Sequence, residues 1–276
     1  MIQELFRLGP ISISPFGVML VAAFAVGYWR LSWGLKRLGV GDSDDASSIV
    51  FAAGVGGIAG AKIYYAILYH DWRLLLERSG LVWYGGFVLG ALAVLWTVRR
   101  RRLPLWSTLD AAAPGLALGY GIGRIGCFLV GDDYGRPTTL PWGVEFPNGL
   151  PPTTAYYLRR EFGVDLPASV PDGQLLAVHP TQLYETLAAL VVFAVGTWLI
   201  VRRAPTGRPF LAVLGLLAVE RFLVEIVRAK DDRFLGPLTL AQAISLLLIA
   251  IVAVLWWRTR AHVAGGAPLE VAEARR

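Results

Sequence analysis

Apolar residues occur along the chain in seven stretches of about twenty residues, separated by short polar segments. The stretches cover about 15–35, 47–69, 81–98, 108–130, 180–201, 209–228 and 238–257. A helix of about 20 apolar residues crosses a hydrocarbon core about 30 Å thick, whereas a membrane-spanning strand needs only about ten. The pattern therefore predicts an all-α, polytopic membrane protein with about seven transmembrane helices.

Composition and charge support this class of protein. Hydrophobic residues make up 55% of the 276 residues and charged residues 17%, which is far more apolar than a soluble protein of this length. The net charge of +6 does not indicate nucleic-acid binding, because the basic residues form short clusters after the first, third, fifth and seventh stretches. By the positive-inside rule these clusters face the cytoplasm, so we expect the N-terminus outside and the C-terminus inside.

The polar segments predict the domain organisation. The only long extramembrane stretch, about 131–178, is rich in Pro and Gly and contains one amphipathic piece, TTAYYLRREFG. We expect a small outer-face head on a single transmembrane domain, 1–260, followed by a disordered cytoplasmic tail, 261–276. Gly56 and Gly60 form a small-xxx-small face that permits close helix packing.

Several charged residues interrupt the apolar stretches. Each costs about 2.5 to 3.5 kcal/mol within a membrane on insertion scales, and such residues usually mark function. In the predicted topology all of them lie in or near the outer half of their helices. They are Lys62, Arg124, Glu185, Glu220, Arg221, Glu225 and Arg228.

The sixth stretch has the clearest spacing. Arg221, Glu225 and Arg228 follow at i, i+4 and i+7, so they share one helical face and Glu225 can bridge both arginines. One interpretation is a self-neutralising ladder that holds helices together. The other is a phosphate site, because the arginines exceed the acid by one and a guanidinium can hold phosphate bidentately.

The segment GRIGCFLVGDDYGRPT, residues 123–138, places Arg124 among glycines such as Gly126, which let a backbone or a bulky ligand approach closely. Asp132, Gly135 and Arg136 follow where the helix ends. A snorkelling arginine above an ordinary capping turn is the structural alternative to a binding site.

Two further motifs lie at the predicted outer face. VWYGGFVLGA supplies Tyr84, Gly85 and Gly86 at the start of the third helix, and HPTQLYE supplies His179 and Gln182 at the start of the fifth. Each could be only an interfacial anchor. Because four helices bring polar groups to the same depth, we interpret them as one cavity.

These motifs together resemble a known family. GRIGCFLVGDDYGR, YGG, HPTQLYE and RFLVEIVR occur in the order seen in prolipoprotein diacylglyceryl transferases, and the similarity extends from SPFGVML to LTLAQAISL. The resemblance implies a multi-pass enzyme of the bacterial inner membrane. Such an enzyme transfers the diacylglyceryl group of phosphatidylglycerol to the thiol of the lipobox cysteine in a prolipoprotein signal peptide and releases glycerol phosphate, with no cofactor, metal or nucleic acid.

The resemblance also suggests roles for single residues. Arg124 and Arg221 would hold the phosphate, with help from Arg228 or Arg136. Glu225, Asp132 and Tyr84 are unranked candidates for the group that activates the thiol, and Glu225 could instead orient the arginines. Substrate binding would further involve Gly85, Gly86, Gly126, Gly135, His179 and Gln182.

Four positions depart from the usual family pattern. Cys127 stands where Asn is common, Asp132 where Glu is common, Tyr84 where His is common and Phe16 where Tyr is common. We interpret Cys127 as a packing residue rather than a covalent nucleophile. The changes at Phe16, Tyr84 and Cys127 leave a non-catalytic lipid-binding paralogue as an alternative to the enzyme. The charged residues within the helices leave a small-molecule transporter as a second alternative, because such residues also mark substrate paths.

Overall fold

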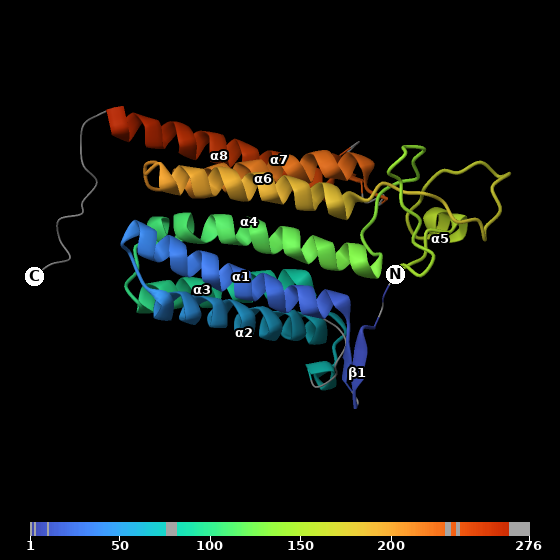
Figure 1. The fold of residues 1–276 in the computed structure, drawn as a ribbon, viewed down its shortest axis with the longest axis horizontal. Coiled ribbons are helices and arrows are strands. Elements are labelled where there is room, and N and C mark those ends of the chain that lie inside the picture. The colour runs from blue at the N-terminus through green and yellow to red at the C-terminus, as the bar shows by residue number, and fades with distance from the viewer. Residues whose placement is uncertain are drawn as a thin grey trace, which may run out of the picture.

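The computed structural model describes residues 2, 4–9, 11–75, 82–229, 233–235 and 238–264. In this part of the chain, seven long helices lie side by side in a bundle (Figure 1). They are α1 (Pro15–Leu38), α2 (Ser43–Leu68), α3 (Trp83–Arg100), α4 (Leu105–Val130), α6 (Thr181–Val201), α7 (Arg208–Val227) and α8 (Leu240–Ala264).

The remaining elements are short. The 3-10 helix η1 (Trp72–Leu75) follows α2, and α5 (Ala155–Arg160) lies in the segment between α4 and α6. Two antiparallel hairpins pair β1 (Phe6–Leu8) with β2 (Ile11–Ile13) and β3 (Arg233–Leu235) with β4 (Leu238–Thr239). The predicted amphipathic piece TTAYYLRREFG thus contains α5.

Five of the described helices, α1, α2, α4, α6 and α8, are long and apolar enough to cross a membrane. The helix α7 does not meet this criterion because Arg208, Glu220, Arg221 and Glu225 interrupt it, and the 18-residue α3 ends in two arginines. Both helices nevertheless pack within the bundle, α3 on α2 and α7 between α6 and α8. The all-α, multi-pass membrane class is therefore confirmed.

Local signals set the helix ends. Asp42 caps α2, because its side chain accepts from the amides of Asp44 at 2.8 Å and Asp45 at 3.0 Å, and the Asp45 carboxylate accepts from the Asp42 amide. This capping box starts α2 at Ser43, four residues before the apolar stretch. Gly131 ends α4 with a left-handed backbone, φ 76°, a conformation that favours glycine.

Small residues let the helices approach closely. A Cβ atom on Gly56 would lie 2.8 Å from the Cβ of Ala93 in α3, which confirms the predicted packing face on α2. A Cβ on Gly121 would lie 3.0 Å from the Cβ of Ala189 in α6. The central helix α4 packs on α1, α6 and α7, and such contacts drive helix association in lipid, where water exclusion contributes little.

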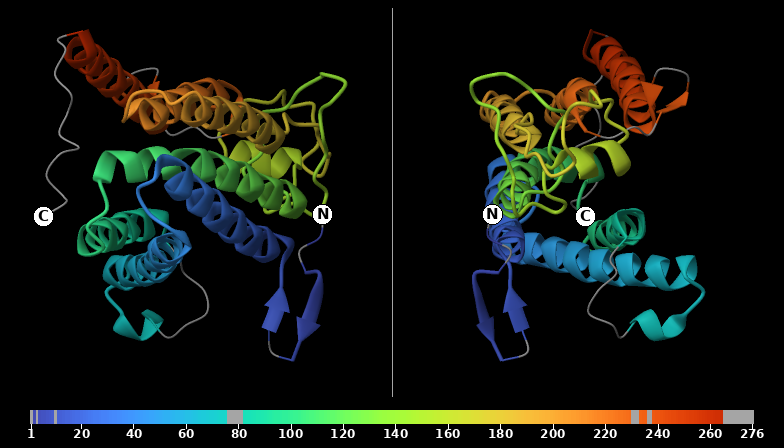
Figure 2. Two further views of the ribbon diagram at one scale, coloured as in Figure 1. Left: turned by 60° about the vertical axis from the view of Figure 1, so that its left-hand side comes forward. Right: turned by 90° about the vertical axis from the view of Figure 1, so that its right-hand side faces the viewer.

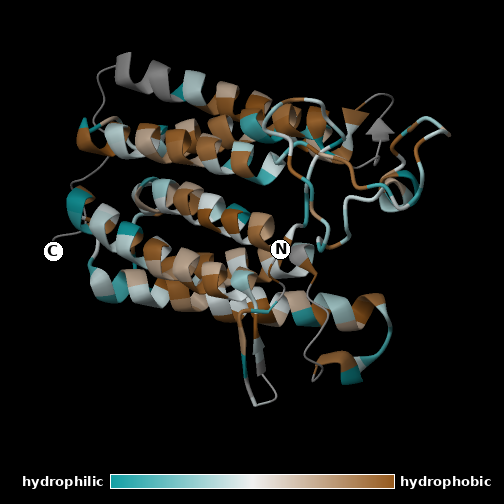
Figure 3. Ribbon diagram, turned by 45° about the vertical axis from the view of Figure 1, so that its right-hand side comes forward, coloured by the Kyte–Doolittle hydropathy of each residue, from teal (hydrophilic) through white to brown (hydrophobic). Residues whose placement is uncertain are grey.

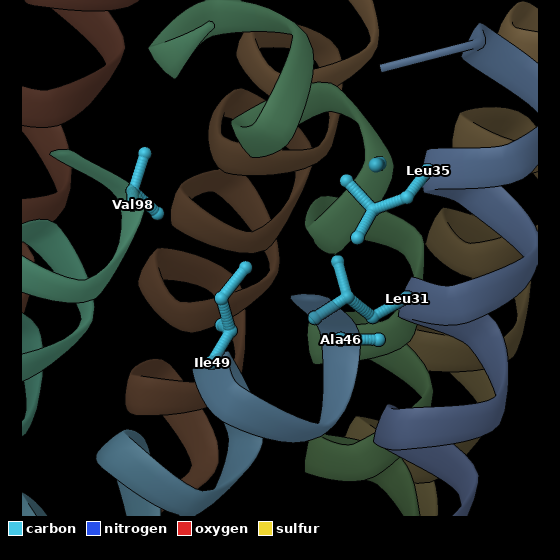
Figure 4. Close-up of a cluster of buried hydrophobic side chains, with 6 residues drawn as sticks. Leu31, Leu35, Ala46, Ile49 and Val98 are labelled. Atoms are coloured by element: carbon cyan, nitrogen blue, oxygen red, sulfur yellow. The ribbon is translucent and has the colours of Figure 1, made fainter. Parts of the chain in front are cut away.

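A cluster of buried side chains ties α1, α2, α3 and α4 together at one end of the bundle (Figure 4). Leu35 and Ala46 are fully buried there, and Val98 of α3 packs with them. The clusters of Lys and Arg lie at this same end, where Figure 3 shows polar helix ends. This agrees with the predicted cytoplasmic face, although the orientation itself stays a prediction.

The segment between α4 and α6 forms the head at the opposite end (Figure 2). Its core consists of Tyr134, Phe146, Leu158 and Val178, joined by Ala229 from beyond α7. The helix α8 extends to Ala264, and the rest of the predicted tail lies outside the described residues. The assignment of 1–260 to one domain stays a prediction.

Candidate active site

Arg124 lies near the end of α4, beside the turn that leads into the head. Its side chain is 15% exposed, its Nη1 lies 2.8 Å from Asp133 Oδ2 and its Nε lies 3.2 Å from Glu185 Oε2. The guanidinium also lies 5.2 Å from the ring centre of Tyr120. The turn after Gly131, in which Asp133 has a φ of 56°, folds Asp133 back over Arg124.

Glu185 connects two arginines from different helices. This α6 side chain is 1% exposed, and its Oε1 accepts from the Tyr120 hydroxyl at 2.9 Å and lies 3.6 Å from Arg221 Nη1 of α7. One carboxylate therefore holds Arg124 and Arg221 side by side. We refer to Arg124, Asp133, Glu185, Arg221, Glu225 and Arg228 as the arginine cluster.

The α7 residues are only partly arranged as the sequence predicted. Arg221 Nη2 lies 2.5 Å from Glu225 Oε2, as the i, i+4 spacing implies. Arg228 pairs with Asp133 instead, so the prediction that Glu225 bridges both arginines is wrong. The reason is that α7 ends at Val227 and Arg228 has an extended backbone, with ψ 142°, which turns its side chain off the helical face.

Acids from other elements balance the charge of the arginines. The cluster contains three guanidinium groups, those of Arg124, Arg221 and Arg228. Asp133 and Glu185 join Glu225 there, so three carboxylates balance the three positive charges. Glu220 is also buried nearby on α7, and its Oε1 has no hydrogen-bond partner. An incoming anion that contacts Arg124 or Arg228 competes with Asp133, whose side chain is 43% exposed.

The two adjacent aspartates differ in their electrostatic environments. Burial raises the pKa of Asp132, whose Oδ1 has no hydrogen-bond partner. Burial also acts on Asp133, but the guanidinium groups of Arg228 and Arg124 outweigh it and hold the pKa of Asp133 below its usual range. Asp132 is thus the better proton acceptor of the two, and Asp133 stays ionised to lower pH.

Cys127 lies beneath this pair. It is buried, and its Sγ lies 3.8 Å from Arg124 Nη1. Ligand atoms of Cys127, Asp132 and Asp133 fall within 4.8 Å of one another. Because Asp133 is already paired with two guanidinium groups, the surroundings favour an anion over a metal cation.

Gly135, Arg136 and Gln182 fasten the head to the helices. A Cβ on Gly135 would lie 2.6 Å from the carbonyl oxygen of Val227, so a larger residue would push the loop away from α7. Arg136 Nε donates to the Arg228 carbonyl at 3.2 Å, and Gln182 Nε2 donates to the Asp132 carbonyl. These contacts place Asp132 and Arg228. Gly126 similarly packs against α1, where its Cβ would lie 3.2 Å from a ring carbon of Phe16.

His179 faces a separate apolar pocket of about 430 Å³ beside the cluster. Its Nδ1 lies 3.2 Å from the Tyr184 hydroxyl, which also accepts from Trp142 Nε1 at 2.7 Å. Burial lowers the pKa of His179. The pocket is lined by Leu140, Trp142, His179, Tyr184, Leu223, Val224 and Val227.

The predicted residues of α2 and α3 are placed differently. Gly85 and Gly86 pack against the backbone of α2, and Tyr84 is 56% exposed. Lys62 donates to the Leu74 carbonyl of η1 at 3.5 Å. The convergence of polar groups is therefore confirmed for α4, α6 and α7, and a place for Tyr84 in the same site stays a prediction.

Three residues of the site were not assigned to it from the sequence. Glu185 had a visible signal as a charge within an apolar stretch, and Asp133 stood next to Asp132. Tyr120 had no signal, because a tyrosine in an apolar stretch does not indicate which side chain it contacts. Their roles depend on contacts between residues far apart in the sequence, such as Tyr120 with Glu185, 65 positions apart, and Asp133 with Arg228, 95 positions apart.

Comparisons with known proteins agree with this arrangement. The family model described as prolipoprotein diacylglyceryl transferase matches residues 3–258. A phosphatidylglycerol–prolipoprotein diacylglyceryl transferase of Xylella fastidiosa is 38% identical over 91% of this chain and 90% of its own length. A protein of the same name from Vibrio cholerae serotype O1 is 30% identical over the same shares.

Proposed function

The chain belongs to the prolipoprotein diacylglyceryl transferase family, and on this basis we propose that the arginine cluster is where it transfers the diacylglyceryl group of phosphatidylglycerol to prolipoproteins. The observation that carries the proposal is the position of Glu185, which holds Arg124 and Arg221 from two helices within 3.2 Å and 3.6 Å of one carboxylate. Paired guanidinium groups suit a phosphate that carries negative charge.

The phosphate binds by exchange with Asp133. This carboxylate contacts both Arg124 and Arg228 and lies at the exposed edge of the cluster, where a lipid headgroup arrives. When phosphate replaces it, Arg124, Arg221 and Arg228 surround the leaving group and stabilise the charge that develops there. Glu185 stays in place, because it is fully buried and orients two of the three arginines.

Asp132 takes the proton of the substrate thiol. Its unpartnered buried oxygen and raised pKa favour protonation, whereas Glu225 is committed to Arg221 at 2.5 Å and orients it. The thiolate sulfur then forms a bond to the glyceryl carbon. The bond from that carbon to the phosphate oxygen breaks, its electron pair leaves with glycerol phosphate, and the thioether remains.

Both substrates arrive through the membrane. Phosphatidylglycerol and the signal peptide with its lipobox cysteine enter between helices from the outer leaflet of the bacterial inner membrane. The apolar pocket beside the cluster, between α6, α7 and the head, has a volume suited to part of an acyl chain. It supports a lipid path next to the arginines.

Replacement of the paired arginines tests the proposal. In membranes supplied with phosphatidylglycerol and a lipobox peptide, Arg124→Ala and Arg221→Ala should each abolish thioether formation, measured as the mass shift of the peptide. Arg160→Ala removes the same charge from α5, away from the cluster, and should transfer normally. Normal transfer in both cluster variants would exclude the phosphate-binding role.

Complementation separates the enzyme from its alternatives. Expression of the wild-type chain in a conditional diacylglyceryl transferase mutant should restore lipidated lipoproteins, because only the enzyme supplies the thioether. A stable protein that inserts into the membrane but restores no lipidation would favour a non-catalytic paralogue.

A further inference from the structure

A groove lies between α2 and α3, at the end of the bundle far from the arginine cluster. Its volume is about 590 Å³. Phe51 and Trp96 form its walls and are 73% and 60% exposed, while Ala52 and Ala59 line it with small side chains. The groove is thus open to the surface of the bundle, and small residues line it between the two aromatic side chains.

The dimensions of the groove match one leaflet of a bilayer. It extends from Ser48 to Ala59 along α2, which is about 16 Å at 1.5 Å per helical residue. Half of a hydrocarbon core about 30 Å thick is about 15 Å. An acyl chain that follows the groove would therefore stay within one leaflet, with its headgroup beside Ser48.

The polar end of the groove carries positive charge. Arg101 is held in place, since its Nη1 lies 3.1 Å from Asp45 Oδ1 and its Nη2 donates to Ser48 Oγ at 2.6 Å. Arg100 lies over the Trp96 ring at 5.0 Å, and within the described residues no carboxylate forms an ion pair with it. Arg100 is thus exposed at the polar end of the groove.

We propose that this groove is a binding site for a bilayer phospholipid with an anionic headgroup, in the leaflet opposite to the one where transfer takes place. The phosphate lies beside Arg100 and Ser48, and one acyl chain lies along Phe51, Val55 and Ala59. The site is independent of the arginine cluster, because it is built from other helices at the other end of the bundle.

Photolabelling tests the proposal. The full chain is placed in phosphatidylcholine vesicles that contain a minor fraction of phosphatidylglycerol with a diazirine on one acyl chain, and labelled peptides are mapped after irradiation. The peptide with Phe51 and Val55 should be labelled, and labelling should fall about fivefold in Arg100→Ala, equivalent to about 1 kcal/mol for one interfacial basic residue. Labelling at the outer end of α4 is the internal measure of correct folding.

Three further measurements sharpen the test. Arg99 lies at the same helix end but does not line the groove, so Arg99→Ala removes the same charge and should be labelled like the wild type. Ala59→Phe should fill the groove and abolish labelling there. Equal labelling by a diazirine-bearing phosphatidylcholine, or an equal loss in Arg99→Ala and Arg100→Ala, would overturn the proposal. The proposal would also be overturned if the wild-type protein were a dimer that Ala59→Phe dissociates, because a second copy of the chain would then cover the groove.

Discussion

Substitution of Glu185 by Gln perturbs the centre of the arginine cluster with almost no change in side-chain volume. The amide can still accept from the Tyr120 hydroxyl, which donates at 2.9 Å, but it cannot neutralise Arg124 and Arg221. Removing one partner of a buried ion pair costs about 3 to 5 kcal/mol. We expect a loss at the lower end, about 3 kcal/mol, because the hydrogen bond persists and Arg221 keeps Glu225.

Unfolding of the purified protein in mixed detergent micelles measures this loss. Glu161→Gln, an exposed position in the head, removes the same charge and should change the free energy of unfolding by no more than about 0.5 kcal/mol. Removing Arg221 together with Glu185 should cost less than the sum of the two single changes, because the remaining charges are again balanced.

Activity gives a second measurement on the same variant. If Glu185 orients the arginines, Glu185→Gln should lower kcat for transfer even at temperatures where the protein is fully folded. A free energy of unfolding within about 0.5 kcal/mol of wild type, with strictly additive effects in the double variant, would refute the view that this carboxylate holds the two guanidinium groups.

Three further changes test the surroundings of the cluster. Gly135→Ala should destabilise the protein by about 1 to 3 kcal/mol, because a Cβ there meets a backbone carbonyl, whereas Gly173→Ala, which has nothing within 4 Å, should not. Because the pKa of Asp133 is lowered, its ion pairs stabilise the folded state above about pH 4, and this stabilisation is lost as the pH falls through the lowered pKa. In Asp133→Asn, the free energy of unfolding measured against pH should no longer show that loss. Cys127→Ser should retain transfer activity, and complete inactivity of a folded variant would contradict its assignment as a packing residue.

The apolar pattern predicted the elements of the fold well because each depends on nearby residues. The seven stretches correspond to the seven long helices, and Gly56 packs on α3 as its spacing implied. The largest shift of a predicted start came at α2, because the Asp42 capping box lies outside the apolar stretch. Hydropathy thus predicts the apolar part of each helix, whereas the polar residues at which a helix begins depend on single capping side chains.

Prediction of the site was less complete. Arg124 and Arg221 were correctly expected to come together, but Arg228 was assigned to Glu225 although it pairs with Asp133. A spacing of i, i+7 holds only while the helix continues, and α7 ends one residue too early. Tyr84 was grouped with the others because of its predicted depth, and its place in the site stays a prediction.

By itself, the sequence determined the helices, their approximate ends, the polar residues at their outer halves and the family. Only the tertiary structure decided that Glu185 lies between Arg124 and Arg221, that Asp133 closes the cluster and that acids balance the three arginines. The physical reason is rotation about the helix axis. A helix in lipid is apolar on nearly every side, so its hydropathy does not show which face meets a neighbour, and close packing of small residues such as Gly121 against α6 fixes that face.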